Sequence, residues 1–153
     1  MTLHIQRAPA LSTVSSLLKA ADLPTEDITV DLLTHFLYAA IDNEPVGVIG
    51  AVPCGGDALV RSLVVAAAHR GKGLGSRLVA AAESHAQDQG ACGLYLLTLT
   101  AEGFFRGHGY QPVAREKAPA AIRSTAEFSH ICPVSSVFMF KPLKDRQAPS
   151  EGR

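Results

Sequence analysis

Three glycines within five residues, Gly71, Gly73 and Gly75, constrain this chain more than any other feature. They follow an apolar run, 59–65, and precede a stretch starting at Leu74 in which apolar residues recur every four positions. The first pattern is typical of a strand and the second of an amphipathic helix. Glycine tolerates positive φ, and the first amides of a helix have no partner within the helix. The segment therefore predicts a strand, an anion-binding loop and a helix in succession.

The charged and polar residues beside the glycines make phosphate the expected ligand of this loop. Arg70 and Lys72 add positive charge, and Ser76 adds a hydroxyl. A Walker A loop is excluded because Lys72 is followed by Gly73 instead of Ser or Thr. A dinucleotide fingerprint is a poor match, since Ser76 stands at its third glycine and a strand meander precedes it. The alternative without a ligand is a tight strand-to-helix turn.

The remaining segments supply the elements around the loop. Apolar runs separated by short turn-rich segments predict an antiparallel meander before the loop, and a strand, a short helix and two further strands are expected after its helix. The expected order, β-α-α-β-β-β-α-β-α-β-β, describes an α/β (α+β) fold with a mixed, mostly antiparallel sheet of about seven strands flanked by about four helices. We expect strands at 3–5, 36–41, 46–52, 59–65, 94–99, 111–115 and 134–140, a helical turn within 119–128, one domain over 1–143 and a disordered polar tail over 144–153.

Composition excludes several classes of function. The 153 residues carry 14 Lys plus Arg and 14 Asp plus Glu, which argues against binding of nucleic acid or a membrane surface through net charge. No run approaches the ~20 apolar residues that cross a bilayer, and the start lacks the apolar core of a signal peptide. We therefore expect a cytoplasmic protein. Cys54, Cys92 and Cys132 form no close pair, so neither a disulfide framework nor a metal site is predicted.

Two motifs resemble those of one enzyme family. The segment Arg70-Gly71-Lys72-Gly73-Leu74-Gly75 is similar to the Arg/Gln-x-x-Gly-x-Gly/Ala signature of the GNAT superfamily. The segment 104–110, Phe-Phe-Arg-Gly-His-Gly-Tyr, resembles its aromatic-x-x-x-Gly-aromatic element after the next strand. The resemblance covers roughly residues 3 to 142. It implies an N-acetyltransferase that uses acetyl-coenzyme A (acetyl-CoA) and no metal; dimerisation is common in that family, so a homodimer is one expectation.

The resemblance also implies a cofactor site. The strand before the loop would pair its main chain with the pantetheine arm, and the loop amides would bind the pyrophosphate. The strand 94–100 would splay away and leave a V-shaped gap for the thioester. The cofactor-binding residues implied in this way are Leu63, Val64, Val65, Arg70, Gly71, Lys72, Gly73, Leu74, Gly75, Ser76, Phe104 and Phe105.

Two positions depart from the chemistry of the family. Many members have a glutamate base where Arg61 stands, and a tyrosine that protonates the leaving thiolate where Phe105 stands. An arginine stays protonated, so Arg61 can instead clamp a substrate carboxylate; a surface arginine in a salt bridge is the alternative. Phenylalanine has no proton to give, so another group, water or unassisted departure must replace it.

Other residues are then candidates for acid-base work. Glu102 and Glu127 are expected as base or amine contacts. Tyr110 is expected as the acid, with His108 or water as alternatives. For Tyr110, as for Phe104, packing in the core is the competing interpretation. Glu83 is expected on the solvated face of its helix.

The segment 118–133 indicates the class of the acceptor substrate. Residues 118–128, with Cys132-Pro133, resemble acetyltransferases encoded in bacterial arsenic-resistance operons, which implies a small amino-acid-like amine substrate, arsenicals included. A site for arsenite on the cysteines is not favoured, because their spacing brings no three thiols together. Two alternatives remain open, namely an acyl-CoA-binding regulatory module without turnover and a protein acetyltransferase. The substrate-binding residues expected are Arg61, Arg123, Glu127 and Thr98.

Overall fold

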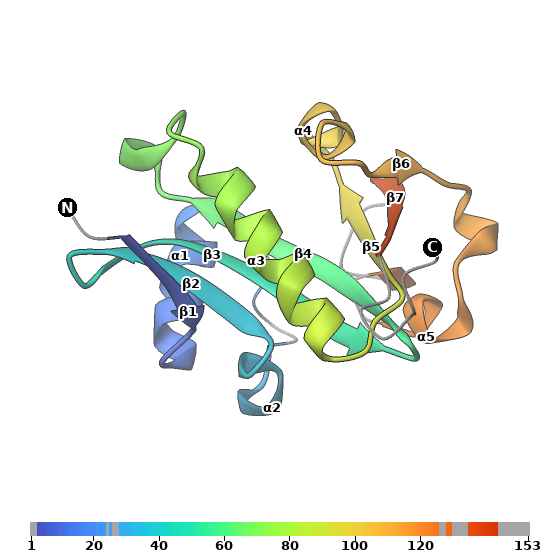
Figure 1. Cartoon of the computed structure of the whole chain (residues 1–153), viewed down its shortest axis with the longest axis horizontal. Helices are drawn as coiled ribbons and strands as arrows, with labels where there is room; N and C mark the ends of the chain where they lie inside the picture. Colours follow the sequence, from blue (N-terminus) through green and yellow to red (C-terminus); the bar gives the residue numbers. More distant parts are fainter. Residues whose placement is uncertain (1–2, 24, 26–27, 126–127, 130–134, 144–153) are drawn as a thin grey trace, which may run out of the picture.

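The computed structural model describes residues 3–23, 25, 28–125, 128–129 and 135–143. These residues form a seven-stranded sheet with the order β1-β2-β3-β4-β5-β7-β6 (Figure 1). The pair β4 and β5 is parallel, and every other neighbouring pair is antiparallel, which confirms the expected mostly antiparallel sheet. The strands are β1 Leu3–Arg7, β2 Phe36–Ile41, β3 Glu44–Cys54, β4 Asp57–Val65, β5 Gly93–Thr98, β6 Gln111–Pro112 and β7 Val137–Pro142.

The described residues contain five α-helices, one more than expected. The additional one is α5, which lies where the sequence indicates a helical turn. Single 3-10 turns precede the glycine loop and α5. The helices are α1 Leu11–Ala20, α2 Val30–Leu33, α3 Leu74–Asp88, α4 Glu102–Arg106 and α5 Ala120–Arg123, and the 3-10 turns are η1 Ala67–His69 and η2 Arg115–Lys117.

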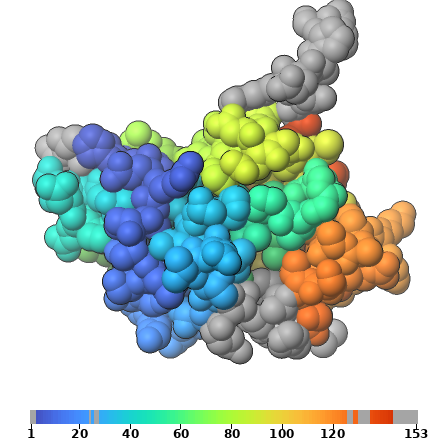
Figure 2. All heavy atoms as spheres, turned by 90° about the horizontal axis from the view of Figure 1, so that it is seen from below, coloured from blue at the N-terminus to red at the C-terminus, as the bar shows by residue number. Residues whose placement is uncertain are grey.

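The helices cover both faces of the sheet. On α3 the expected apolar stripe is buried, and it forms the main core with one face of β2 to β5. Neighbouring residues of a strand point to opposite faces, so Leu37 packs in this core while Phe36 packs on the other side against α1. A third cluster joins α5 to β4 and β7 through Ile122, Leu59 and Phe138. Figure 2 shows α3 (yellow-green) on one side and α1 (blue) and the α5 region (orange) toward the other.

The last third of the fold differs in detail from the sequence pattern. The expected strand at 111–115 is shortened to the two residues of β6, which ends at Pro112, a residue without a backbone N–H to donate. The final strand is β7, starting at Val137 instead of 134, and residue 134 and the predicted tail lie outside the described residues. No helix in the described ranges is both long and apolar enough to span a bilayer.

A histidine pair ties the start of β2 to the last turns of α3. His35 Nδ1 lies 3.1 Å from His85 Nε2, so one nitrogen donates and the other accepts. Burial lowers the pKa of His35, with a further contribution from the charge of Arg7. The pKa of His85 is lowered by burial and then by His35 and Arg7, while Asp88 acts in the opposite direction. The fold therefore favours neutral histidines at this contact.

We predict that stability falls as this pair is forced to take up protons. Because both folded pKa values lie below the ordinary value of 6.5, the unfolded chain binds protons first as pH falls below it. The free energy of unfolding, measured by urea titration, should decrease below about pH 6.5 until the folded pKa values are passed. The double variant His35→Gln/His85→Gln should flatten this decrease, whereas His4→Gln on exposed β1 should keep it. An unchanged slope in the double variant would contradict the assignment.

Candidate active site

The two parallel strands of the sheet separate soon after they meet. Their pairing is confined to Ala58 with Leu94 and Leu59 with Tyr95. Beyond this point β4 stays paired with β3 as far as Val65, and β5 stays paired with β7 as far as Thr98. Beyond Leu59, no strand in the described part of the chain pairs with the edge of β4 that faces β5. Backbone amides and carbonyls need partners, so this edge can take the amides of an extended ligand.

A bulge shapes the free part of β4. Val48 pairs with Val64 and Gly50 with Arg61, so Ser62 and Leu63 together lie opposite one residue of β3. Ser62 has a φ of +61°, a left-handed conformation that is uncommon for a non-glycine residue in a strand. The extra residue bends the strand and shifts the side-chain alternation. As a result Leu63 packs toward the main core, like Val60, and Arg61 points to the other face.

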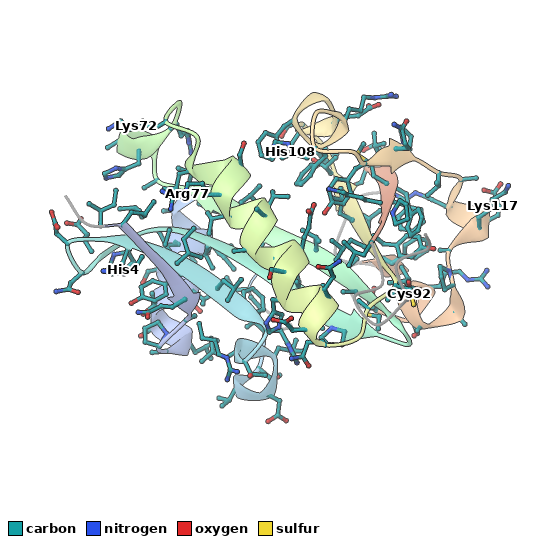
Figure 3. All side chains as sticks on the ribbon, in the orientation of Figure 1. His4, Lys72, Arg77, Cys92, His108 and Lys117 are labelled. Carbon is teal, nitrogen blue, oxygen red and sulfur yellow. The ribbon has the colours of Figure 1, made fainter. Side chains whose placement is uncertain are left out.

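The glycine loop has the backbone expected of an anion site. Gly71 and Gly73 have φ of +78° and +79°, and Gly73 is the N-cap of α3 without a side-chain capping bond. The first amides of α3 therefore lack the partner that a capping side chain would give them. Together with the positive end of the helix dipole they can bind a pyrophosphate. Lys72 is exposed at this loop, ahead of α3 (Figure 3).

Two predicted anion ligands have structural partners. Arg70 Nε donates to the carbonyl oxygen of Val65 at 3.0 Å, which anchors the loop to the end of β4. The Ser76 hydroxyl lies 2.9 Å from His108 Nε2. Arg70 and Ser76 thus fasten the loop at both ends, and backbone amides remain the principal donors to a phosphate.

The aromatic residues after β5 divide into two roles. Phe105 is 5% exposed and packs edge to face against Tyr110 in the main core. Phe104 is partly buried and lies against the first turn of α3, where its ring comes within 3.4 Å of the place that a Cβ on Gly75 would take. Phe104 can therefore line the cofactor site, whereas Phe105 lies in the core beneath α4.

The hydroxyl of Tyr110 is directed at Glu83. Tyr110 is fully buried and donates to Glu83 Oε2 at 3.1 Å, and Lys141 Nζ lies 3.0 Å from the same oxygen. Burial, followed by the charge and the hydrogen bond of Glu83, raises the pKa of Tyr110 far above its usual range. The expectation that Glu83 lies on the solvated face is wrong, since this carboxylate joins α3, β7 and the segment after α4. Its side chain is only 19% exposed.

The remaining candidate acid-base and substrate residues are dispersed. Glu102 begins α4 and forms an exposed ion pair with Arg106, with 2.9 Å between Oε2 and a guanidinium nitrogen. Thr98 accepts a hydrogen bond from the Ala101 amide, and by alternation it shares the face of Leu94 and Leu96, toward α3. Arg123 is exposed at the end of α5, and Glu127 lies outside the described residues. The structure therefore does not bring Thr98 to the face that carries Arg61.

Arg61 is a buried arginine at the point where the strands separate. It is 6% exposed and stands two residues beyond Leu59, the last residue of β4 that pairs with β5. Its Nε donates to Ser62 Oγ at 3.0 Å, and its guanidinium carbon lies 5.8 Å from the centroid of the Phe36 ring. Arg61 shares the face of Leu59, opposite α3, between the clusters around α1 and α5. Arg61 is therefore buried and does not lie on the surface.

Several solved structures share this architecture. N-acetylglutamate synthase from Neisseria gonorrhoeae, complexed with coenzyme A and N-acetyl-glutamate, covers 94% of this chain with a TM-score of 0.80 and 16% identity, while the chain spans 36% of the synthase. Rv2747 from Mycobacterium tuberculosis, in complex with coenzyme A, gives a TM-score of 0.75 and 22% identity over 92% of this chain and 99% of that one. No curated protein matches the chain in sequence.

A family model settles the classification. The model of the acetyltransferase (GNAT) domain matches residues 33–112, more than half of the chain. The chain therefore belongs to the GNAT acetyltransferase family. Two features of this family member could hold acetyl-CoA: the glycine loop could take the pyrophosphate, and the edge of β4 beyond Leu59 could take the pantetheine arm.

Sequence reasoning missed the contact between α4 and α3. His108 stands four residues after Phe104, and spacing of this kind places two side chains on one face of a helical turn. That spacing was a usable signal for a shared role of the two residues. The partner, Ser76, is 32 positions away in sequence, and no local pattern indicates such a contact.

We predict that Gly73→Ala weakens coenzyme A binding. Alanine at a φ of +79° costs about 1–2 kcal/mol, so the loop must relax away from its anion-binding form. The dissociation constant from calorimetry should rise about tenfold, the equivalent of 1.4 kcal/mol. Gly103→Ala in α4 is the matched control, because Gly103 lacks a positive φ and has nothing within 4 Å of an added Cβ. Equal affinity in the wild type and Gly73→Ala would contradict the loop assignment.

Proposed function

We propose that this enzyme acetylates the amine of a small amino-acid-like substrate that carries a carboxylate. The observation that carries the proposal is Arg61, a buried guanidinium at the divergence of β4 and β5, on the face opposite α3. Its orientation is held by Ser62 and by the ring of Phe36. A planar guanidinium held in this way suits bidentate recognition of a carboxylate.

The proposed reaction is direct transfer within the gap. Acetyl-CoA would lie along the free edge of β4, with its pyrophosphate on the first turn of α3 and its thioester where the strands diverge. The neutral amine of the acceptor attacks the thioester carbonyl, a C–N bond forms, and the C–S bond breaks. The amine proton passes to water or a nearby carboxylate, for which Glu102 is the candidate at the start of α4.

The leaving thiolate receives no proton from the usual position. Phe105 is packed in the core, and the Tyr110 hydroxyl is committed to Glu83. A thiol has an ordinary pKa of about 8.5, so its anion is a tolerable leaving group and can be protonated by solvent after departure. The rate of acetyl transfer then depends on the positioning of the thioester and the neutral amine, and less on a side chain that acts as general acid.

Known relatives support an amino-acid acceptor. The gonococcal protein that shares this fold is an N-acetylglutamate synthase complexed with N-acetyl-glutamate, a product that bears carboxylates. The resemblance of residues 118–128 to arsenic-operon acetyltransferases extends the proposal to arsenical amino acids, whose arsenic-bound oxygens an arginine could also bind. Arg123 at the end of α5 lies on the same side of the sheet as Arg61 and would be a second cation for such a group.

The function can be tested by measuring release of free thiol from acetyl-CoA with a panel of acceptors. The panel should hold acidic and neutral amino acids, arsenical analogues, polyamines and a lysine peptide, each amino acid also as its carboxamide. Turnover of free acids over their carboxamides would support the proposal. Faster turnover of the peptide would identify a protein acetyltransferase instead. Binding of coenzyme A without turnover of any amine would favour a regulatory module. Phe105 is compatible with that alternative, because it is buried and has no proton to donate to the leaving thiolate.

We predict that Arg61→Lys selectively impairs recognition of the acceptor. Lysine keeps the charge but lacks the two-pronged geometry of the guanidinium, so the KM of the acceptor should rise about tenfold while the KM of acetyl-CoA stays unchanged. The preference of the wild type for the free acid over its carboxamide should shrink in the variant. Lys117→Gln, at an exposed cation of η2, is the control and should behave like the wild type. An unaltered preference in Arg61→Lys would refute the clamp.

A further inference from the structure

His108 connects α4 to the first turn of α3. One ring nitrogen, Nδ1, lies 2.8 Å from the carbonyl oxygen of Phe104, and the other, Nε2, lies 2.9 Å from Ser76 Oγ. The ring also packs on Phe104, with 4.5 Å between centroids. Figure 3 shows His108 in the turn that follows α4 and Lys72 on the loop that leads into α3. Both ring nitrogens of His108 thus have defined partners.

These two contacts fix the direction of the hydrogen bonds. A carbonyl oxygen can only accept, so Nδ1 carries the proton that is donated to Phe104. In the neutral ring Nε2 then accepts, and the hydroxyl of Ser76 donates to it. The hydroxyl proton of Ser76 is therefore directed toward α4, and Ser76 can offer a phosphate its backbone amide instead.

The first turn of α3 needs support from outside the helix. Its N-cap is Gly73, which supplies no side-chain bond, and two glycines of positive φ precede the turn. A capping side chain contributes typically about 1 kcal/mol to the helix end that it holds, and this end has none. Ser76 is the third residue of α3, and the ring of Phe104 rests against the second, Gly75. Phe104 of α4 and His108 of the turn that follows it therefore hold this turn of α3 from outside the helix.

We propose that His108 is a positioning residue for the nucleotide half of acetyl-CoA. It does not touch the pyrophosphate; it holds the first turn of α3, through Ser76, in the conformation whose amides bind that group. The inference rests on the proposed placement of the cofactor, and it goes beyond the family signature because it assigns a contribution to nucleotide affinity to the turn that follows α4. Binding of the pantetheine arm along β4 does not depend on this contact.

Truncated donors separate this role from a general structural one. S-Acetylpantetheine carries the thioester and the arm but lacks the pyrophosphate and the nucleotide. For His108→Leu and for Ser76→Ala we expect kcat/KM with acetyl-CoA to fall about fivefold, as the loss of one hydrogen bond predicts, while kcat/KM with S-acetylpantetheine stays within about twofold. The ratio of the two values within one variant is independent of how much of the sample is folded. His4→Leu on exposed β1 is the control.

The double variant and direct binding complete the test. His108→Leu/Ser76→Ala should be no worse than either single variant, because both remove the same contact. Calorimetry with coenzyme A and with pantetheine should show the same selectivity. This measurement reports on His108 even if no acceptor is turned over, a result that would refute the proposed reaction and leave the cofactor site untouched. Equal losses with both donors, additive losses in the double variant, or no loss with acetyl-CoA would overturn the proposal.

Discussion

The early end of the β4–β5 pairing is the constraint on which the site depends. Two residue pairs hold the parallel strands together, and beyond them no other strand of the described residues pairs with that side of β4. The strands stay apart because each is held by its other neighbour, β4 by β3 and β5 by β7. The bulge at Ser62 bends β4 at this place and shifts the alternation of its side chains between the two faces of the sheet. An extended acyl carrier fits the edge that results.

The rest of the site is arranged around β4 and β5, the two strands that separate. The glycine loop follows directly from the end of β4, anchored there by Arg70, and delivers the first turn of α3 beside the free edge. After β5, Phe104 of α4 and His108 of the following turn contact the same first turn of α3. Arg61 belongs to β4 at the point where this strand separates from β5, and its buried side chain lies on the face opposite α3, where we propose that it binds the acceptor.

The sequence predicts what depends on local pattern. The strand, loop and amphipathic helix around Gly71 and Gly73 were predictable because their periodicity and glycine spacing directly reflect backbone requirements. Contacts between distant segments were not predictable in the same way. The Glu83 carboxylate looked solvated because the helix pattern says nothing of Lys141, 58 positions later. The positive φ of Ser62 was not predicted, because serine, unlike glycine, is not typical of a left-handed backbone conformation.

Hydrogen exchange of backbone amides with and without coenzyme A tests the account most directly. If the free edge of β4 and the glycine loop hold the cofactor, amides within residues 61–65 and 71–76 should gain protection on binding, and those of β1 and β2 should not change. Protection confined to other segments, with the amides of β4 and the loop unchanged at saturating coenzyme A, would contradict the placement of the cofactor in the gap.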